Sequence, residues 1–291
     1  MIRKLLFCIW FIFLGVNVHG SKDLELERQK QLLSILREAV SHQLENDRVR
    51  YRYIYEEQEV IEELIDFYKI KHSATKTYTW FHTELSSFSK LISVNGARYD
   101  THYLKEQDKA IRRSVAKGEG LSSSERKQRL IKTQRKREGE IQTVLFRNLI
   151  AAFIFAPQKS EYVNGSETMV LVFKPKISFK PPNARGAFLL SLKGKLWITK
   201  GSNQLIRLTG ILSNDVNYVG GLFGSLKKGA TFTLEQADIG NGLWFPTFST
   251  VTYKRSLLFK GTHKRQTSLY SHYRLNPFQR RSKVVQVEKL K

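Results

Sequence analysis

Seven histidines are the residues of this chain best suited to bind a metal or to transfer protons near neutral pH. A zinc enzyme would need them in a close pattern, such as HExxH or a short cluster with acids, and the sequence contains neither. They are instead scattered, at His19, His42, His72, His82, His102, His263 and His272. We therefore predict no metal site and interpret the histidines as surface residues.

Other catalytic motifs are incomplete. The glycine-rich stretch Gly220 to Gly224 lacks the strand, helix and downstream acid of a nucleotide site, so a flexible loop is expected there. Ser225 lacks the second glycine of a nucleophile elbow. The only cysteine, Cys8, lies close to the N-terminus, where it serves neither a disulfide framework nor a cysteine–zinc site. The sequence predicts a protein that is not an enzyme and needs no cofactor.

Residues 1–20 are typical of a secretory signal peptide. Arg3 and Lys4 precede an apolar run from Leu5 to Val16, and Val18 and Gly20 are small enough for a cleavage site before Ser21. A membrane-spanning helix usually needs about 20 apolar residues, more than this run provides. We expect cleavage between Gly20 and Ser21 and a mature protein in the periplasm, with an uncleaved membrane anchor as the alternative.

The chain is strongly basic, with a formal net charge of +23. Such an excess attracts anionic partners, and the attraction weakens as salt screens it. For an exported protein, the anionic membrane surface is the nearest such partner. Nucleic acid is not expected, because alternation would place Tyr51, Tyr53 and Tyr55 on the strand face opposite Arg50 and Arg52, which suits a half-buried strand. A basic surface without any specific partner is the other interpretation.

The second half of the chain predicts an antiparallel meander. Its segments are rich in β-branched and aromatic residues and are mostly separated by Gly, Asn or Ser. Their short connections exclude parallel crossovers, which need a dozen or more residues. The predicted strands are Met169 to Ile177, Lys195 to Thr199, Gln204 to Leu212, Ala230 to Ile239, Leu243 to Phe259 and Thr262 to Arg274.

The first half adds helices and more strands. Helical spacing of apolar residues predicts helices from Leu24 to Asn46, capped by Asp23, and from Ile141 to Ala152, and a brief one from Ala187 to Leu192. Alternation predicts a strand from Val49 to Tyr55. Further strands are expected at residues 67–72, 78–85, 90–94, 98–103 and 153–155, with tight turns at Asn95-Gly96 and Asn164-Gly165.

We expect one domain over residues 21–275. Residues 104–139 form a densely charged basic insert with Ser124 as a possible helix cap, interpreted either as a solvated face or as a functional segment. Residues 276–291 are expected to be a flexible basic tail.

Several predicted strands are apolar on both faces, so the sheet needs cover on at least one side. Two arrangements satisfy this pattern. The sheet can curl around a cavity that helices roof, or the helices can fill the concavity and leave a solid core.

Short motifs in this half resemble a known superfamily. Lys193-Gly194-Lys195-Leu196-Trp197-Ile198, followed by Ile206-Arg207-Leu208, resembles the hairpin of periplasmic lipoprotein carriers and outer-membrane lipoprotein-sorting proteins. Gly242 to Thr247, Tyr270 to Arg274 and Phe173-Lys174-Pro175 are similar to motifs of an exported branch of that superfamily. The resemblance covers residues 167–274 and extends over 47–274. Thr199, where an acid is usual, and the insert at 104–139 depart from the pattern.

The resemblance implies a mainly β fold, a curved antiparallel sheet that forms an incomplete barrel roofed by two or three helices. It also implies a cavity that shelters the acyl chains of a lipid or lipoprotein. The expected wall residues are Tyr51, Tyr53, Tyr55, Leu171, Phe173, Ile206, Leu208, Phe232, Leu234, Phe245 and Val251. The alternative is an envelope sensor or protein-interaction module on the same fold, with the basic insert as its contact surface.

Overall fold

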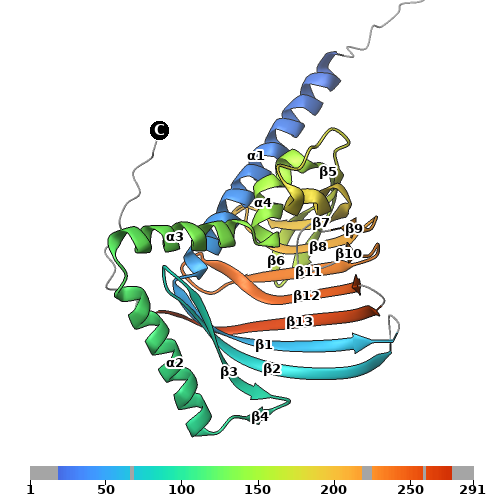
Figure 1. Ribbon diagram of the computed structural model, residues 1–291. Coiled ribbons are helices and arrows are strands. Elements are labelled where there is room, and N and C mark those ends of the chain that lie inside the picture. The colour runs from blue at the N-terminus through green and yellow to red at the C-terminus, as the bar shows by residue number, and fades with distance from the viewer. Residues whose placement is uncertain (1–18, 66–68, 218–224, 258–259, 277–291) are drawn as a thin grey trace, which may run out of the picture.

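The computed structural model describes residues 19–65, 69–217, 225–257 and 260–276 (Figure 1). Within these residues, four α-helices and one short 3-10 helix accompany a single large sheet. The helices are α1 (His19–Arg50), α2 (Thr101–Glu119), α3 (Ser123–Glu138), α4 (Ile141–Ala152) and η1 (Ala184–Leu190). The helix α4 has the predicted bounds, and α1 extends the predicted helix at both ends.

The sheet is antiparallel at every pairing between described strands, and it follows the order β4-β3-β2-β1-β13-β12-β11-β8-β7-β6-β5. Two short strands, β9 and β10, pair beside β12. Its end strands β4 and β5 do not pair with each other, so the described sheet is an open, curved half-barrel, as predicted (Figure 1). The strands are β1 (Tyr53–Leu64), β2 (Ile70–His82), β3 (Ser87–Val94), β4 (Ala97–Arg98), β5 (Phe153–Val163), β6 (Ser166–Pro175), β7 (Leu192–Thr199), β8 (Leu205–Leu212), β9 (Val216–Asn217), β10 (Ser225–Leu226), β11 (Thr231–Asp238), β12 (Trp244–Leu257) and β13 (Lys260–Leu275).

Two hairpins turn as the sequence predicts. Asn95 and Gly96 have φ of 50° and 79°, and Asn164 and Gly165 have φ of 49° and 79°. Positive φ at both central residues is the geometry that two-residue hairpins favour, and asparagine and glycine adopt it most easily.

The main hydrophobic core lies between the helices α1 and α4 and the strands β6, β7, β8 and β11. Leu36 of α1 and Phe146 and Leu149 of α4 are almost fully buried there, against Leu171 and Leu196 of the sheet. Because successive residues of a strand point to opposite faces, Val170 and Trp197 lie on the other face. They form a second cluster there with Val163, Ile206 and Trp244.

A pair of glycines lets the sheet face come close to aromatic rings. Gly194 of β7 and Gly210 of β8 are directly opposite each other in the register. A Cβ at Gly194 would lie 1.9 Å from the backbone oxygen of Thr209, and a Cβ at Gly210 would lie 2.3 Å from the ring of Phe232. Side chains at these positions would therefore collide with the packed sheet.

Several expectations about the first half are corrected. Arg50 ends α1 and Tyr51 and Arg52 form a turn, so the alternating strand begins at Tyr53 rather than at Val49. Asp23 lies inside α1 and therefore does not cap it. The two strands predicted at 67–72 and 78–85 are one strand, β2, whose preceding residues 66–68 lie outside the described part.

The charged insert consists mainly of the two helices α2 and α3. The predicted strand at 98–103 stops at Arg98, and α2 begins at Thr101 because the Asp100 side chain accepts a hydrogen bond from the Tyr103 N–H at 2.8 Å. Ser122, not Ser124, caps α3, and with Glu125 it forms a capping box. The short helix expected at 187–192 is the 3-10 helix η1, three residues earlier at its start.

Three other expectations fall on residues that the structure does not describe. The signal peptide up to residue 18, the glycine-rich stretch and the tail beyond Asn276 lie outside the described part. In that part, no helix is both long and apolar enough to cross a bilayer.

Candidate ligand-binding basin

The concavity beneath α1 and α4 is filled by the protein's own side chains. The space left between these helices and strands β7 and β8 is a cavity of about 10 Å³. A cavity of this size admits at most about one water molecule. Its lining is entirely apolar, formed by Leu36, Ala39, Val40, Phe146, Leu149, Leu196, Ile198 and Leu205. Among the described residues, this half of the concavity is therefore packed as a solid core, and the space lined by these side chains is too small for an acyl chain.

The same concave face continues beyond the helices onto β12, β13, β1 and β2. The register shows this directly, since Leu234 of the core pairs with Ser249, Ser249 with Ser268, and Ser268 with Glu59. Directly opposed residues share one face of a sheet. We call this open part of the face the basin; its residues are Ser249, Val251, Gln266, Ser268, Tyr270, Glu57, Glu59, Ile61, Tyr78 and Trp80.

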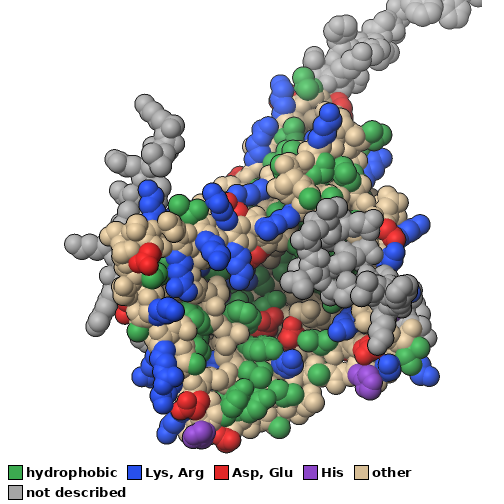
Figure 2. Space-filling model, in the orientation of Figure 1, with side chains coloured by type: hydrophobic (Ala, Val, Ile, Leu, Met, Phe, Trp, Pro, Cys, Tyr) green, Lys and Arg blue, Asp and Glu red, His purple; other side chains and the backbone are tan. Residues whose placement is uncertain are grey.

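The basin is hollow and chemically mixed. Figure 2 shows the hollow beside α3, with hydrophobic and acidic side chains on its floor and Lys and Arg side chains along its helical rim. Val251 is 41% exposed there, a large fraction for an aliphatic side chain on a concave sheet face. The basin thus offers solvent-accessible apolar surface next to the closed core.

Two glutamates lie two residues apart on its floor. The Trp80 Nε1–H donates to Glu57 Oε2 at 2.6 Å, and the Gln266 amide donates to Glu59 Oε1 at 2.6 Å. Burial and the neighbouring charge of Glu57 raise the pKa of Glu59, while Lys76 across the strand pair acts in the opposite direction. The floor can therefore accept hydrogen bonds or a positive charge between its apolar side chains.

An aromatic wall closes one end of the basin. The Tyr55 ring lies 6.1 Å from Tyr270 and 5.2 Å from Tyr273, and Phe245 packs edge-on against Tyr53 and Tyr273. The Ser249 and Tyr270 hydroxyls are 3.1 Å apart. The wall is stiff because most of these rings contact at least two others.

Behind this wall lies a buried group of polar side chains. His82 is stacked on Trp80 at 6.3 Å and lies edge-on to Tyr51 at 5.0 Å. Burial, together with the positive charges of Arg50 and Arg137, lowers the pKa of His82 to about 3. The ring is therefore neutral at physiological pH and serves packing rather than proton transfer.

Helix α3 and the residue that precedes α4 contact this group. The Arg137 guanidinium lies 3.9 Å above the Tyr51 ring, and its Nη2 donates to the Thr83 carbonyl at 3.1 Å. The Tyr51 hydroxyl donates to Glu140 at 3.0 Å. Burial and Glu140 raise the pKa of Tyr51, so its hydroxyl stays protonated. These contacts fix the helical rim relative to the sheet.

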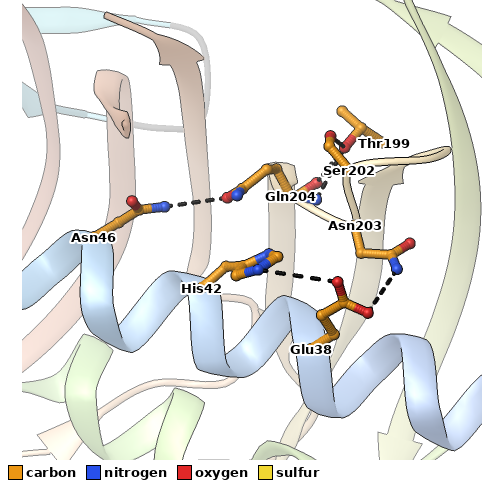
Figure 3. A network of polar contacts seen from close by, with 7 residues as sticks. All are labelled: Glu38, His42, Asn46, Thr199, Ser202, Asn203 and Gln204. Atoms are coloured by element: carbon orange, nitrogen blue, oxygen red, sulfur yellow. Dashed lines mark hydrogen bonds and ion pairs between the residues drawn. The ribbon is translucent and has the colours of Figure 1, made fainter. Parts of the chain in front are cut away.

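A second polar network fixes α1 (Figure 3). Asn203 donates to Glu38 at 3.0 Å, and Asn46 donates to Gln204 at 3.1 Å. The Thr199 hydroxyl accepts from the Gln204 N–H at 2.9 Å and is 2.7 Å from the Ser202 hydroxyl. Thr199, the position that departs from the carrier motif, thus holds the β7–β8 turn against the helix instead of supplying a charge.

The predicted wall residues divide into four groups. Leu171, Phe173, Leu208, Leu234 and Phe232 belong to the filled core or pack against it. Tyr51, Tyr53, Tyr55 and Phe245 belong to the aromatic wall or the polar group behind it. Ile206 belongs to the cluster on the opposite face, and Val251 alone lies on the open floor.

Sequence reasoning missed Glu57, Glu59, Tyr78 and Trp80. The signal was present, because the glutamates and aromatics alternate in register along two adjacent strands. The prediction of the cavity wall selected only apolar and aromatic residues, so it passed over the glutamates on this face. Among the described residues, no group of three His, Cys, Asp or Glu side chains is arranged to hold a metal ion.

No family model matches the sequence, and no curated protein matches it significantly. Among solved structures, the chain is similar to a putative outer-membrane lipoprotein-sorting protein domain from Vibrio parahaemolyticus, at 12% identity and a TM-score of 0.34, over 83% of this chain and 94% of that one. It is also similar to a LolA superfamily protein from Nitrosomonas europaea, at 12% identity and a TM-score of 0.30, over 86% and 97% of the two chains.

A third similar structure is the complex of MucA and MucB from Pseudomonas aeruginosa, at 8% identity and a TM-score of 0.23, over 80% of this chain and 94% of that one. At these scores the similarity supports no statement about a ligand. The fold is described from the strand order of the chain itself.

Proposed function

We propose that this is a periplasmic, non-catalytic binding protein that holds the acyl chains of a lipid or lipoprotein in the basin. The observation that carries the proposal is the accessible apolar surface of Val251, Ile61 and Trp80 on a concave face. Sequestering an acyl chain from water there is favourable by about 25 cal/mol for each Å² of apolar surface removed.

The two halves of the concave face have different tasks in this proposal. The filled half under α1 and α4 supplies the stability of a chain that has no cysteine after Cys8. The open half supplies the binding surface. Glu57 and Glu59 would accept hydrogen bonds from the polar end of the ligand, and their positions between apolar side chains suit an amphipathic molecule.

Tryptophan fluorescence tests the proposal directly. Trp80 lies in the basin, whereas Trp197 and Trp244 lie in the cluster on the opposite face. A fatty acid brominated along its chain should quench Trp80, because bromine quenches indoles at contact. Quenching should disappear in Trp80→Phe and persist in Trp197→Phe. Quenching that survives Trp80→Phe would place the chain elsewhere and contradict the proposal.

A matched pair of variants gives a second test. Val251 and Leu269 are on adjacent strands, are 41% and 45% exposed, and lie on opposite faces of the sheet. Val251→Glu should abolish fatty-acid binding, and Leu269→Glu should leave it unchanged. Native mass spectrometry of the purified protein, which detects a co-purifying lipid, provides the check without added ligand.

A peptide-binding sensor is the second candidate function. Glu57 and Glu59 favour it, because none of the ion pairs between described residues involves either of them, and an extended segment rich in Lys or Arg would pair with both. Glu57→Gln with Glu59→Gln separates the two functions. The double variant should lose a basic peptide but retain the brominated fatty acid.

A further inference from the structure

The helices α2 and α3 form a rigid basic arm at the rim of the basin. We define the arm as residues 101–138, and Figure 1 shows its two helices joined at an angle beside β3. Figure 2 shows Lys and Arg side chains along it. The sequence left two interpretations of this segment open, a solvated face or a functional surface.

The arm is fixed to the sheet, which a merely solvated insert would not need. The Gln107 side chain of α2 donates to the Leu91 carbonyl at 2.9 Å and accepts from the Leu91 N–H at 3.0 Å. Lys90 pairs with Asp108 at 2.7 Å. These contacts dock one face of α2 on β3 and leave the opposite face to solvent.

The helix α3 is fixed in the same way. The Thr133 hydroxyl donates to the Leu85 carbonyl at 2.8 Å, and Arg126 pairs with Glu84 at 2.7 Å. Together with Arg137, these residues follow one another at spacings of seven and four, so they share one face of the helix. The opposite face carries Lys127, Ile131, Lys132 and Arg135, all of them exposed.

Most acidic side chains of the arm are already engaged. Asp108 pairs with Lys90, Glu106 with Lys109 at 3.6 Å, Glu138 with Arg147 at 3.4 Å, and Glu125 bonds to the Ser122 cap. The outward face of α2 adds Lys105, Arg112 and Arg113, also exposed. The solvent face of the arm is therefore cationic on both helices.

An exposed apolar side chain lies between these cations: Ile131, on the solvent face of α3, is 41% exposed. Leu130, 37% exposed, and Tyr103, 39% exposed and stacked on Tyr99 at 4.2 Å, lie on the sides of the helices that face the sheet and are still partly accessible. Helices that bind the surface of a bilayer combine cations with apolar and aromatic side chains in this way. A nucleic-acid surface would give Ile131 and Leu130 no apolar environment.

From this combination we propose that the arm docks the protein on an anionic lipid bilayer. Lys and Arg side chains are attracted to anionic headgroups, while Ile131 enters the interface. Docking does not depend on what the basin holds. If the proposed function is also correct, the docked arm brings the mouth of the basin next to the lipid surface.

Vesicle flotation with the full chain tests this. The protein should float with vesicles of phosphatidylcholine mixed with phosphatidylglycerol and remain behind with phosphatidylcholine alone. Because each cation near an anionic surface contributes about fivefold to partitioning, Lys127→Glu/Lys132→Glu/Arg135→Glu should weaken binding by about a hundredfold or more. Binding should also fall steeply in 1 M salt, where the screening length is only about 3 Å.

The matched control carries the same change in net charge. Lys159→Glu/Lys174→Glu/Lys193→Glu replaces three exposed lysines on β5, β6 and β7, away from the arm, and should bind as the native protein does. Equal loss in both triple variants would mean that only the overall charge attracts the protein, and would overturn the proposal. So would binding to phosphatidylcholine alone, or an arm-dependent affinity for short duplex DNA without one for vesicles. Circular dichroism confirms that each variant is folded.

Discussion

The indole of Trp80 and the carboxylate of Glu57 are joined by a 2.6 Å hydrogen bond on the floor of the basin. The two residues come from adjacent strands, β2 and β1, and their side chains meet diagonally across the pair. The bond fixes the orientation of the indole ring. It therefore holds Trp80 in one orientation in the basin, where the indole would report by its fluorescence on a ligand bound there as proposed.

Acid should destabilise the protein through His82. Its pKa in the folded chain, about 3, lies below the ordinary value of 6.5, so the unfolded chain binds more protons between these values. Stability is then complete above pH 6.5 and falls as the pH drops toward 3, by at most about 1.4 kcal/mol for each pH unit. Urea unfolding at pH 7 and pH 5 measures the loss, and His82→Gln should reduce the difference. An unchanged difference in that variant would assign the acid sensitivity to other groups.

Shortening a buried and an exposed leucine of α1 to alanine should have very different effects on the stability of the protein. Leu36 is completely buried in α1, so Leu36→Ala should lower the free energy of unfolding by about 2–5 kcal/mol. Leu26, in the same helix, is 51% exposed, and Leu26→Ala should change it by less than about 0.5 kcal/mol. Chemical denaturation gives both numbers. Similar small values for the two variants would mean that α1 does not rest on the sheet as described.

The glycine pair should respond unequally to alanine. At Gly194 the added methyl would meet the backbone oxygen of Thr209, which cannot move without disturbing the β7–β8 ladder. At Gly210 it would meet the Phe232 ring, which can shift. We expect Gly194→Ala to cost several kcal/mol, about 3 or more, and Gly210→Ala to cost less. Thermal melts rank the two variants, and the reverse order would contradict this account of the sheet.

Removing the cap of α3 should loosen the arm without unfolding the protein. Ser122 and Glu125 form the capping box, so Ser122→Ala should destabilise the start of the helix by about 1 kcal/mol. Ser123→Ala, one residue later, is the control and should have little effect. Amide hydrogen exchange in residues 123–128 measures both. Equal exchange in the two variants would show that the contacts of Arg126 and Thr133 hold the helix start without its cap.

The sequence predicted the fold class because the relevant signals are local. Alternation gave the six strands of the second half to within a few residues, and helical spacing gave α4 with its observed bounds. The turns at Asn95-Gly96 and Asn164-Gly165 followed from the backbone preferences of two residues each. Such signals need no knowledge of distant contacts.

The predictions from the sequence fail where contacts between residues far apart in the chain determine the local structure. Val49 and Tyr51 alternate like strand residues, yet α1 continues to Arg50 because its end packs into the polar group behind the aromatic wall. The sequence could not tell which of the predicted wall residues are covered: Leu171, Leu208 and Leu234 meet the helix-covered core, whereas Val251 lies on the open part of the face. No periodicity reveals which part of a sheet the helices cover.

The amide of Gln107 presents Leu91 with one donor and one acceptor, as a further strand would. Strand β3, which β4 covers only at Ser93 and Val94, is thereby blocked at its midpoint against pairing with the strand of another molecule. A long antiparallel sheet with an unpaired edge is prone to polymerise edge to edge. The Gln107 side chain occupies the backbone N–H and C=O of Leu91, which such pairing along β3 would need.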